Sequence, residues 1–163
     1  MNDLARLIKF KIKPKTPKRS YRVLILGRSG SGRTTIMRAL CEKLGFVPIS
    51  TAELLVDMVR NKTELGQRIY EDLANNKLIS DEIVSGIVKG RINRADCKLH
   101  GFVLEGFPKT EVQVGLMDEI KLEPNFVISI ECSSDLAKER IVKRYEAQGK
   151  KVSAEEMQSI EER

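Results

Sequence analysis

Residues 21–40 read YRVLILGRSGSGRTTIMRAL, and this stretch decides the fold. Its first residues form an apolar run without polar alternation, which predicts a strand buried on both faces, as in a parallel sheet. A glycine-rich turn follows, and the apolar positions after the turn are spaced for one buried face of a helix. Residues 27–34 match the phosphate-loop pattern G-x-x-x-x-G-K-[ST], except that Arg33 stands in the lysine position.

The residue types in this turn suit phosphate binding. Gly27, Gly30 and Gly32 can adopt backbone angles that other residues avoid, and they leave no Cβ between the chain and a phosphate. Successive N–H groups can then point into one concavity, at the positive end of the following helix. The hydroxyl of Thr34 or Thr35 is a suitable ligand for Mg²⁺. We therefore expect a phosphate-binding loop here.

The charge of the chain is unevenly distributed. The whole chain has 29 Lys and Arg against 23 Asp and Glu, a net charge of +6. Residues 1–20 hold seven of the cations and one of the acids, so residues 21–163 carry 22 of each (29 − 7 and 23 − 1). The composition predicts a basic leader over 1–20 and one α/β domain over 21–163.

The leader allows two interpretations. Its alternating lysines and its prolines favour an extended arm, which is either a solvated tail or a segment that attaches to an anionic surface such as an acidic protein. Nucleic acid is a minor option because Phe10 is the leader's only aromatic residue. A transit peptide is disfavoured by the lysines and prolines. No apolar run is long enough for a transmembrane segment, and a secretory signal is absent from the N-terminus.

The three cysteines predict reduced, mostly buried thiols in a cytosolic protein, because their number is odd and no C-x-x-C pair occurs. Further strands are expected at residues 46–49, 101–104 and 126–130. A helix is expected after a hydroxyl cap at Ser50, continuing through residues 65–73, and others after Ser80, Thr110 and Ser133. Strands that alternate with helices predict a doubly wound parallel α/β domain, with ligands at the carboxyl ends of the strands.

Four motifs, in order, resemble those of the adenylate kinases and, more broadly, of the nucleoside monophosphate kinases. GRSGSGRTT (27–35) resembles G-x-P-G-S-G-K-G-T, and ISTAELL (49–55) resembles the S-T-G-D-L-L-R segment of the monophosphate site. GFVLEGFPKT (101–110) with Gln113 resembles G-F-[IL]-L-D-G-[FY]-P-R-x-x-x-Q, the most specific of the four. AKERIVKR (137–144) resembles the hinge helix R-x-x-x-R that enters the lid. The resemblance covers residues 21–163.

The resemblance implies a P-loop fold with a helical monophosphate-binding insert at about 50–80 and a short lid at about 145–158. A full family member continues into a final strand and helix, which are not in this sequence. It also implies roles for individual residues. ATP would be bound by Gly27, Gly30, Ser31, Gly32, Arg33, Thr34, Thr35 and Arg140. The monophosphate would be bound by Thr51, Arg60, Gly106, Lys109 and Gln113. Mg²⁺ would be held, partly through water, by Thr34, Thr35 and Glu105. The catalytic set would be Arg33, Lys109, Arg140, Arg144 and Arg163.

The chain departs from the family pattern at Arg33 (lysine in the family), Val56 and Lys109 (both arginine) and Glu105 (aspartate). These departures leave three functions open. The first is phosphoryl transfer from ATP–Mg²⁺ to AMP or a related monophosphate, in the cytoplasm. The second is a catalytically degenerate scaffold, docked by its leader on a cytoskeletal or ciliary assembly. The third is a small-molecule kinase with another acceptor.

Overall fold

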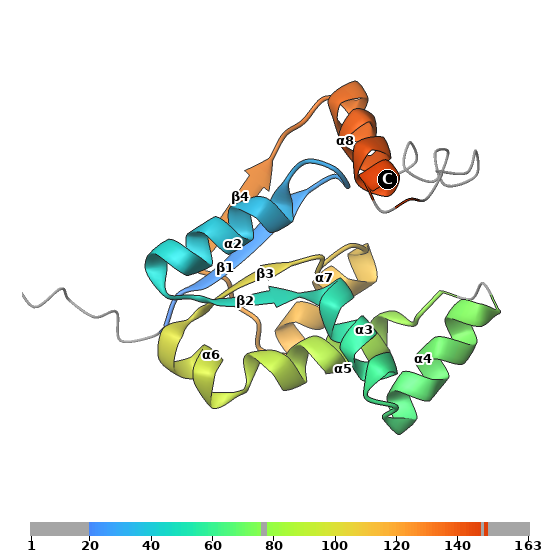
Figure 1. Cartoon of the computed structure of the whole chain (residues 1–163). Helices are drawn as coiled ribbons and strands as arrows, with labels where there is room; N and C mark the ends of the chain where they lie inside the picture. Colours follow the sequence, from blue (N-terminus) through green and yellow to red (C-terminus); the bar gives the residue numbers. More distant parts are fainter. Residues whose placement is uncertain (1–19, 76–77, 148, 150–163) are drawn as a thin grey trace, which may run out of the picture.

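The computed structural model describes residues 20–75, 78–147 and 149, and within them four parallel strands form one sheet (Figure 1). The strands are β1 (Arg22–Gly27), β2 (Val47–Ser50), β3 (Phe102–Glu105) and β4 (Phe126–Ile130), in the order β2-β3-β1-β4. Consecutive strands are therefore connected by crossovers through helices, and helices cover both faces of the sheet. The predicted doubly wound parallel α/β fold is confirmed.

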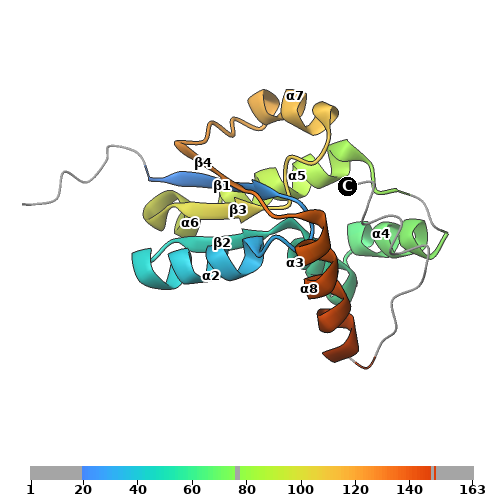
Figure 2. The same cartoon turned by 90° about the horizontal axis from the view of Figure 1, so that it is seen from above.

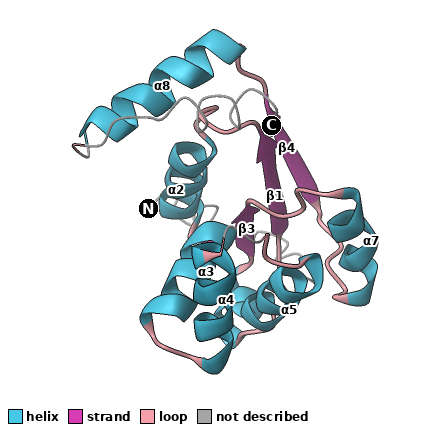
Figure 3. Ribbon diagram, turned by 90° about the vertical axis from the view of Figure 1, so that its right-hand side faces the viewer, coloured by secondary structure: helices cyan, strands magenta, loops and turns pink. Residues whose placement is uncertain are grey.

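Helices cover the two faces unequally (Figures 2 and 3). α2 lies on one face, and α5, α6 and α7 lie on the other, whereas α3, α4 and α8 lie towards the carboxyl ends of the strands. None of these helices is long and apolar enough to cross a membrane. Their bounds are α2 (Arg33–Leu44), α3 (Thr51–Arg60), α4 (Glu64–Ala74), α5 (Asp81–Ile92), α6 (Ala95–His100), α7 (Glu111–Glu119) and α8 (Ser134–Ala147).

The side chains of the central strands alternate between two cores. On the α2 face, Val23 and Ile25 of β1 pack with Met37 and Cys41. On the opposite face the larger core gathers apolar side chains from β1, β2, β3, α5, α6 and the α7 region: Leu24, Ile49, Val84, Val88, Ile92, Cys97, Phe102, Leu104, Phe107, Ile120 and Leu122. Burial on both faces explains why β1 and β3 are apolar runs.

The cysteines are all free, with Cys41 and Cys97 buried and Cys132 half-buried. Burial raises the pKa of the Cys41 and Cys97 thiols above the ordinary value. The neutral thiol is therefore the stable form inside both cores.

Two predictions of local structure were wrong, and one helix was not predicted. The helix after Ser50 ends at Arg60, and α4 is a separate helix, because Lys62 adopts a positive φ of 50° between them. Ser50 precedes α3 but makes no side-chain cap hydrogen bond. The short helix α6 was not predicted, because six residues are too few for a helical period to show.

Candidate functional site

The glycine-rich turn joins β1 to α2, where the carboxyl end of a central strand meets a helix N-terminus. Gly27, Gly30 and Gly32 have φ values of 146°, 79° and 98°. A Cβ on Gly30 would lie 2.5 Å from the backbone oxygen of Ala137, so α8 packs directly on the loop. No side chain caps the N-terminus of α2. The first N–H groups of α2 are thus without a side-chain partner, as an anion-binding terminus requires.

Two features of the loop fit a phosphate. The hydroxyl of Ser31 is buried and, among the described residues, has no hydrogen-bond partner. The Nη1 atom of Arg140 on α8 donates to the backbone oxygen of Ser31 over 3.3 Å. The same nitrogen lies 3.8 Å from the position that a Cβ on Gly32 would take. The Arg140 guanidinium therefore lies over the loop, where it adds positive charge.

The packing of α8 against the loop includes a polar contact near Arg140. Arg28, within the loop, donates a hydrogen bond from its guanidinium to the hydroxyl of Ser134, the first residue of α8. The contact is exposed to solvent, with Ser134 exposed and Arg28 half-buried. The contact and the close approach at Gly30 hold the first turn of α8 beside the loop.

Oxygen ligands for a cation come from the start of α2 and the end of β3. The hydroxyl of Thr34 lies 2.9 and 3.1 Å from the two carboxylate oxygens of Glu105, which is only 7 % exposed. Hydroxyl and carboxylate oxygens suit Mg²⁺, which keeps several waters and also binds substrate phosphates. Among the described residues, no group of three or more His, Cys, Asp or Glu side chains could hold a metal ion. Thr35 is exposed.

A second set of predicted residues lies around the ends of β2 and β3. The hydroxyl of Thr51, which is buried, donates to the backbone oxygen of Glu105 over 3.0 Å. Gly106 follows with a φ of 80°, and a Cβ there would lie 3.5 Å from Thr51 and 3.7 Å from the Lys109 side chain. Thr51, Gly106 and Lys109 are therefore neighbours, beside the Thr34–Glu105 pair.

Gln113 is buried, at 4 % exposure, and its amide has protein partners at both ends. Its Oε1 atom accepts from the backbone N–H of Lys109, and its Nε2 atom donates to Asp81, both over 2.7 Å. The other carboxylate oxygen of Asp81 accepts from the hydroxyl of Thr110 over 2.8 Å. We call Asp81, Thr110, Gln113 and the backbone N–H of Lys109 the amide clamp. Sequence reasoning missed Asp81, whose only signal was its place in the first turn of α5.

Within the described part of the chain, the other predicted site residues form no hydrogen bond or ion pair with the groups described above. Arg33 opens α2, is half-buried and has no hydrogen-bond or ion-pair partner among residues 20–75, 78–147 and 149. Arg144 lies over the ring of Tyr145, 5.9 Å from its centroid. Arg60 pairs with Asp57 on the exposed surface of α3 at 3.6 Å. Arg163, most of the lid and nearly all of the basic leader lie outside the described residues.

The glycine loop, the Thr34–Glu105 pair and the residues after β3 all lie at the carboxyl ends of the strands, where open α/β sheets bind their ligands. A comparison with protein-family models agrees with this arrangement. The model described as adenylate kinase matches residues 25–163, from the middle of β1 to the last residue of the sequence. This match covers most of the chain and includes each of the four motifs. The chain belongs to the adenylate kinase family.

Proposed function

We propose that this protein transfers the γ-phosphoryl group of ATP–Mg²⁺ reversibly to AMP or a related nucleoside monophosphate. Family membership indicates a nucleotide-binding, kinase-like domain. The observation that supports the finer proposal is the set of groups around the loop: Arg140 over the backbone of Ser31, beside the Thr34–Glu105 pair. An anion site and hard oxygen ligands stand together there, as phosphoryl transfer requires.

On the donor side, the residues of the loop would hold the phosphates. The first backbone N–H groups of α2, after Gly32, and the unpartnered hydroxyl of Ser31 would donate to phosphate oxygens. Arg33 and Arg140 would add charge, and Arg144 would approach when α8 and the lid move. Bound Mg²⁺ would neutralise charge on the phosphates. Thr34 and Glu105 would orient its ligands, directly or through water.

On the acceptor side, the residues around the ends of β2 and β3 would bind the monophosphate. The Lys109 ammonium would contact its phosphate, and Gly106 leaves space for a close approach of the ligand. Thr51 and Gln113 would contact the base. One amide hydrogen and one lone pair of Gln113 remain for this, because the amide clamp uses the others. Arg60, one turn after Val56, would add charge when the insert at about 50–80 closes.

A second candidate is a structural role without turnover, in which the leader docks the domain on an acidic surface such as a cytoskeletal or ciliary assembly. Two observations favour it. Lys109 and Arg33 replace residues that the family pattern uses at the transferred phosphate, and the net charge of +6 lies in residues 1–20. Deletion of residues 1–20 would abolish docking in this case and leave nucleotide binding unchanged. The free cysteines support a reducing compartment such as the cytosol for both candidates.

The two candidates are separated by calorimetric titration with ATP–Mg²⁺ and a coupled assay of ADP formation from ATP and AMP. The kinase proposal predicts saturable binding and turnover. The variant Arg33→Lys should raise turnover about tenfold or more, because a lysine is a compact point charge that the family loop accommodates. Arg38→Lys is the matched control, since Arg38 is exposed and pairs with Glu53. If both the parent and Arg33→Lys bind ATP–Mg²⁺ without turnover, the kinase proposal is refuted and the structural role is supported.

A further inference from the structure

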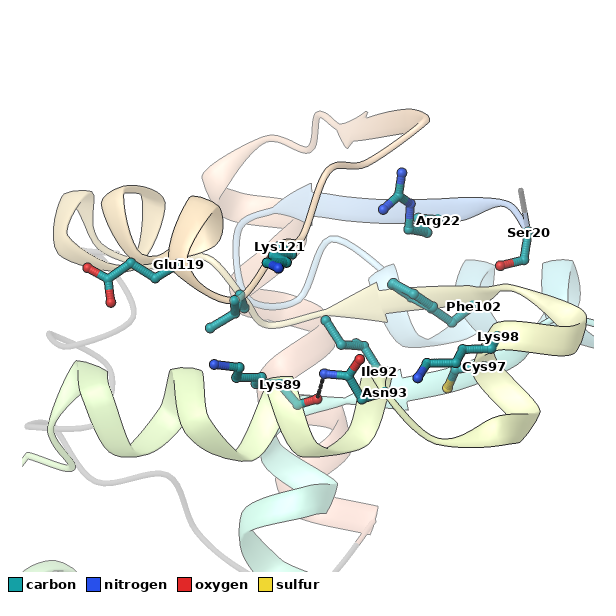
Figure 4. Close-up of a pocket in the computed structure, with 11 residues that line it drawn as sticks. Ser20, Arg22, Lys89, Ile92, Asn93, Cys97, Lys98, Phe102, Glu119 and Lys121 are labelled. Atoms are coloured by element: carbon teal, nitrogen blue, oxygen red, sulfur yellow. Dashed lines mark hydrogen bonds between the residues drawn. The ribbon is translucent and has the colours of Figure 1, made fainter. Parts of the chain in front are cut away.

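A cavity of about 490 Å³ lies at the amino ends of β1 and β3, far from the nucleotide loop at the opposite ends of the strands (Figure 4). The ends of α5 and α7 and the short helix α6 line it together with the two strands, and it is open to solvent on one side. A cavity of this size is within the range of sites for small organic ligands. Nothing in the proposed kinase reaction uses it.

The lining is strongly cationic. The lining contains one acid, Glu119, and four cations, which are Arg22, Lys89, Lys98 and Lys121. The net charge of the lining side chains is therefore +3. Figure 4 shows these cations coming from β1, α5, α6 and the turn after α7, and the Glu119 carboxylate pointing outward at the edge. Charges from separate elements that converge on one cavity raise the local concentration of anions.

Arg22 supplies a buried donor without an acceptor. Its side chain is only 20 % exposed, and its Nε atom is buried and has no partner among the described residues. One of its Nη atoms makes a long ion pair, at 3.6 Å, with Glu123, whose side chain is 72 % exposed. Leaving a buried charged donor unpaired is unfavourable. An oxyanion in the cavity would provide the missing acceptor.

The inner wall is apolar, which limits the class of ligand. Ile92 and Phe102 line the cavity and belong to the buried core, as does Ile120. An inorganic anion would leave this wall without contact, and a neutral apolar molecule would leave the cations unpaired. We propose that this cavity is a second ligand site, which binds a small organic anion with a carboxylate or phosphate at one end and an apolar body.

The test uses calorimetric titration of the full chain with three probes: 4-phenylbutyrate, which has both features, inorganic phosphate, and neutral 4-phenylbutanol. We expect saturable binding of 4-phenylbutyrate and at least about tenfold weaker binding of the other two. Equal binding of phosphate would overturn the proposal, because the apolar wall would then have no role. The absence of saturable heat with 4-phenylbutyrate up to about 10 mM would overturn it too.

The variant Lys89→Gln/Lys98→Gln/Lys121→Gln removes three exposed cations of the lining. We expect it to bind 4-phenylbutyrate about tenfold more weakly than the parent. The matched control, Lys43→Gln/Lys62→Gln/Lys143→Gln, removes the same charge elsewhere and should bind as the parent does. Equal affinities of the two variants would refute the site. Urea midpoints check that both variants fold. The measured quantity is the affinity for 4-phenylbutyrate, so the result is independent of nucleotide binding.

Discussion

The amide clamp gives the sharpest test of the structure, because Gln113 joins two segments that are far apart in the sequence, the residues from Lys109 into α7 and the start of α5. Its oxygen accepts from the Lys109 backbone after β3, and its nitrogen donates to Asp81 at the start of α5. The variant Gln113→Leu keeps the approximate volume of the side chain and removes both hydrogen bonds. The Lys109 N–H and the Asp81 carboxylate then lose a partner each.

The size of the effect follows from the kinds of bond. The neutral bond to Lys109 contributes about 0.5–1.5 kcal/mol and the bond to the charged Asp81 about 1.5–3 kcal/mol, so their sum is about 2–4.5 kcal/mol. Asp81 is half-buried, and water can replace part of its lost bond. We therefore expect a loss of about 2–3 kcal/mol in the free energy of unfolding. For a domain of this size, Tm should fall by about 4–12 °C.

Urea unfolding followed by far-UV circular dichroism measures this loss as a lower midpoint with an unchanged m-value. Val114→Leu, on the exposed face of the same helix, is the control and should stay within about 0.5 kcal/mol of the parent. In a double-mutant cycle, Gln113→Leu and Asp81→Ala should couple by about 1–3 kcal/mol. A stability within about 0.5 kcal/mol of the parent, combined with a large loss of AMP affinity, would refute the clamp and leave Gln113 as a base contact alone.

Three further predictions concern the loop, an exposed carboxylate and the thiols. Gly30→Ala should lower the urea midpoint more than Gly45→Ala does. Both glycines have a positive φ, but only a Cβ on Gly30 would meet backbone atoms. Gly45→Ala should therefore cost only about 1 kcal/mol, from the backbone conformation alone. The Arg91 hydrogen bond lowers the pKa of Asp96 below its ordinary 3.8, so its contribution is present above that pH and lost as pH falls through the folded pKa. Asp96→Asn should thus lower the urea midpoint at about pH 7, and the difference from the parent should shrink as pH falls below the ordinary 3.8. Cys132 should react first with a thiol reagent in a timed labelling experiment, before the two buried cysteines, which need the protein to open.

The strands could be predicted from the sequence because of where they lie. A strand buried on both faces is an uninterrupted apolar run, as β3 shows. The expected strand at residues 126–130 also coincides with β4, although β4 lies at the edge of the sheet and has no buried residue. Residues 46–49 and 101–104 differ from β2 and β3 by one residue at each end. The break between α3 and α4 could not be predicted, because a lysine at positive φ has no compositional signal. Propensity is local, and tertiary contacts decide such a turn.

The residues of the candidate site also fall into two groups, those that a local sequence pattern predicts and those that only long-range contacts bring together. The glycine loop is a local pattern, and the structure gives each of its three glycines the positive φ expected from the sequence. The amide clamp joins residues 32 apart, Asp81 and Gln113, and no local pattern connects them. The same holds for the choice between Thr34 and Thr35, which depends on which helical position faces β3. Long-range contacts of this kind become visible only when the sheet is assembled.

Glu105 shows how the sheet register joins the two halves of the site. It is opposite Ile25 of β1 and opposite Ser50 of β2, so it lies between the loop and the start of α3. Its carboxylate accepts from Thr34 on one side, and its backbone oxygen accepts from Thr51 on the other. The family pattern has an aspartate here, and the additional methylene of glutamate carries the carboxylate further towards α2. The departure therefore preserves an acid beside the loop, and its position is fixed by strand pairing and not by the side chain alone.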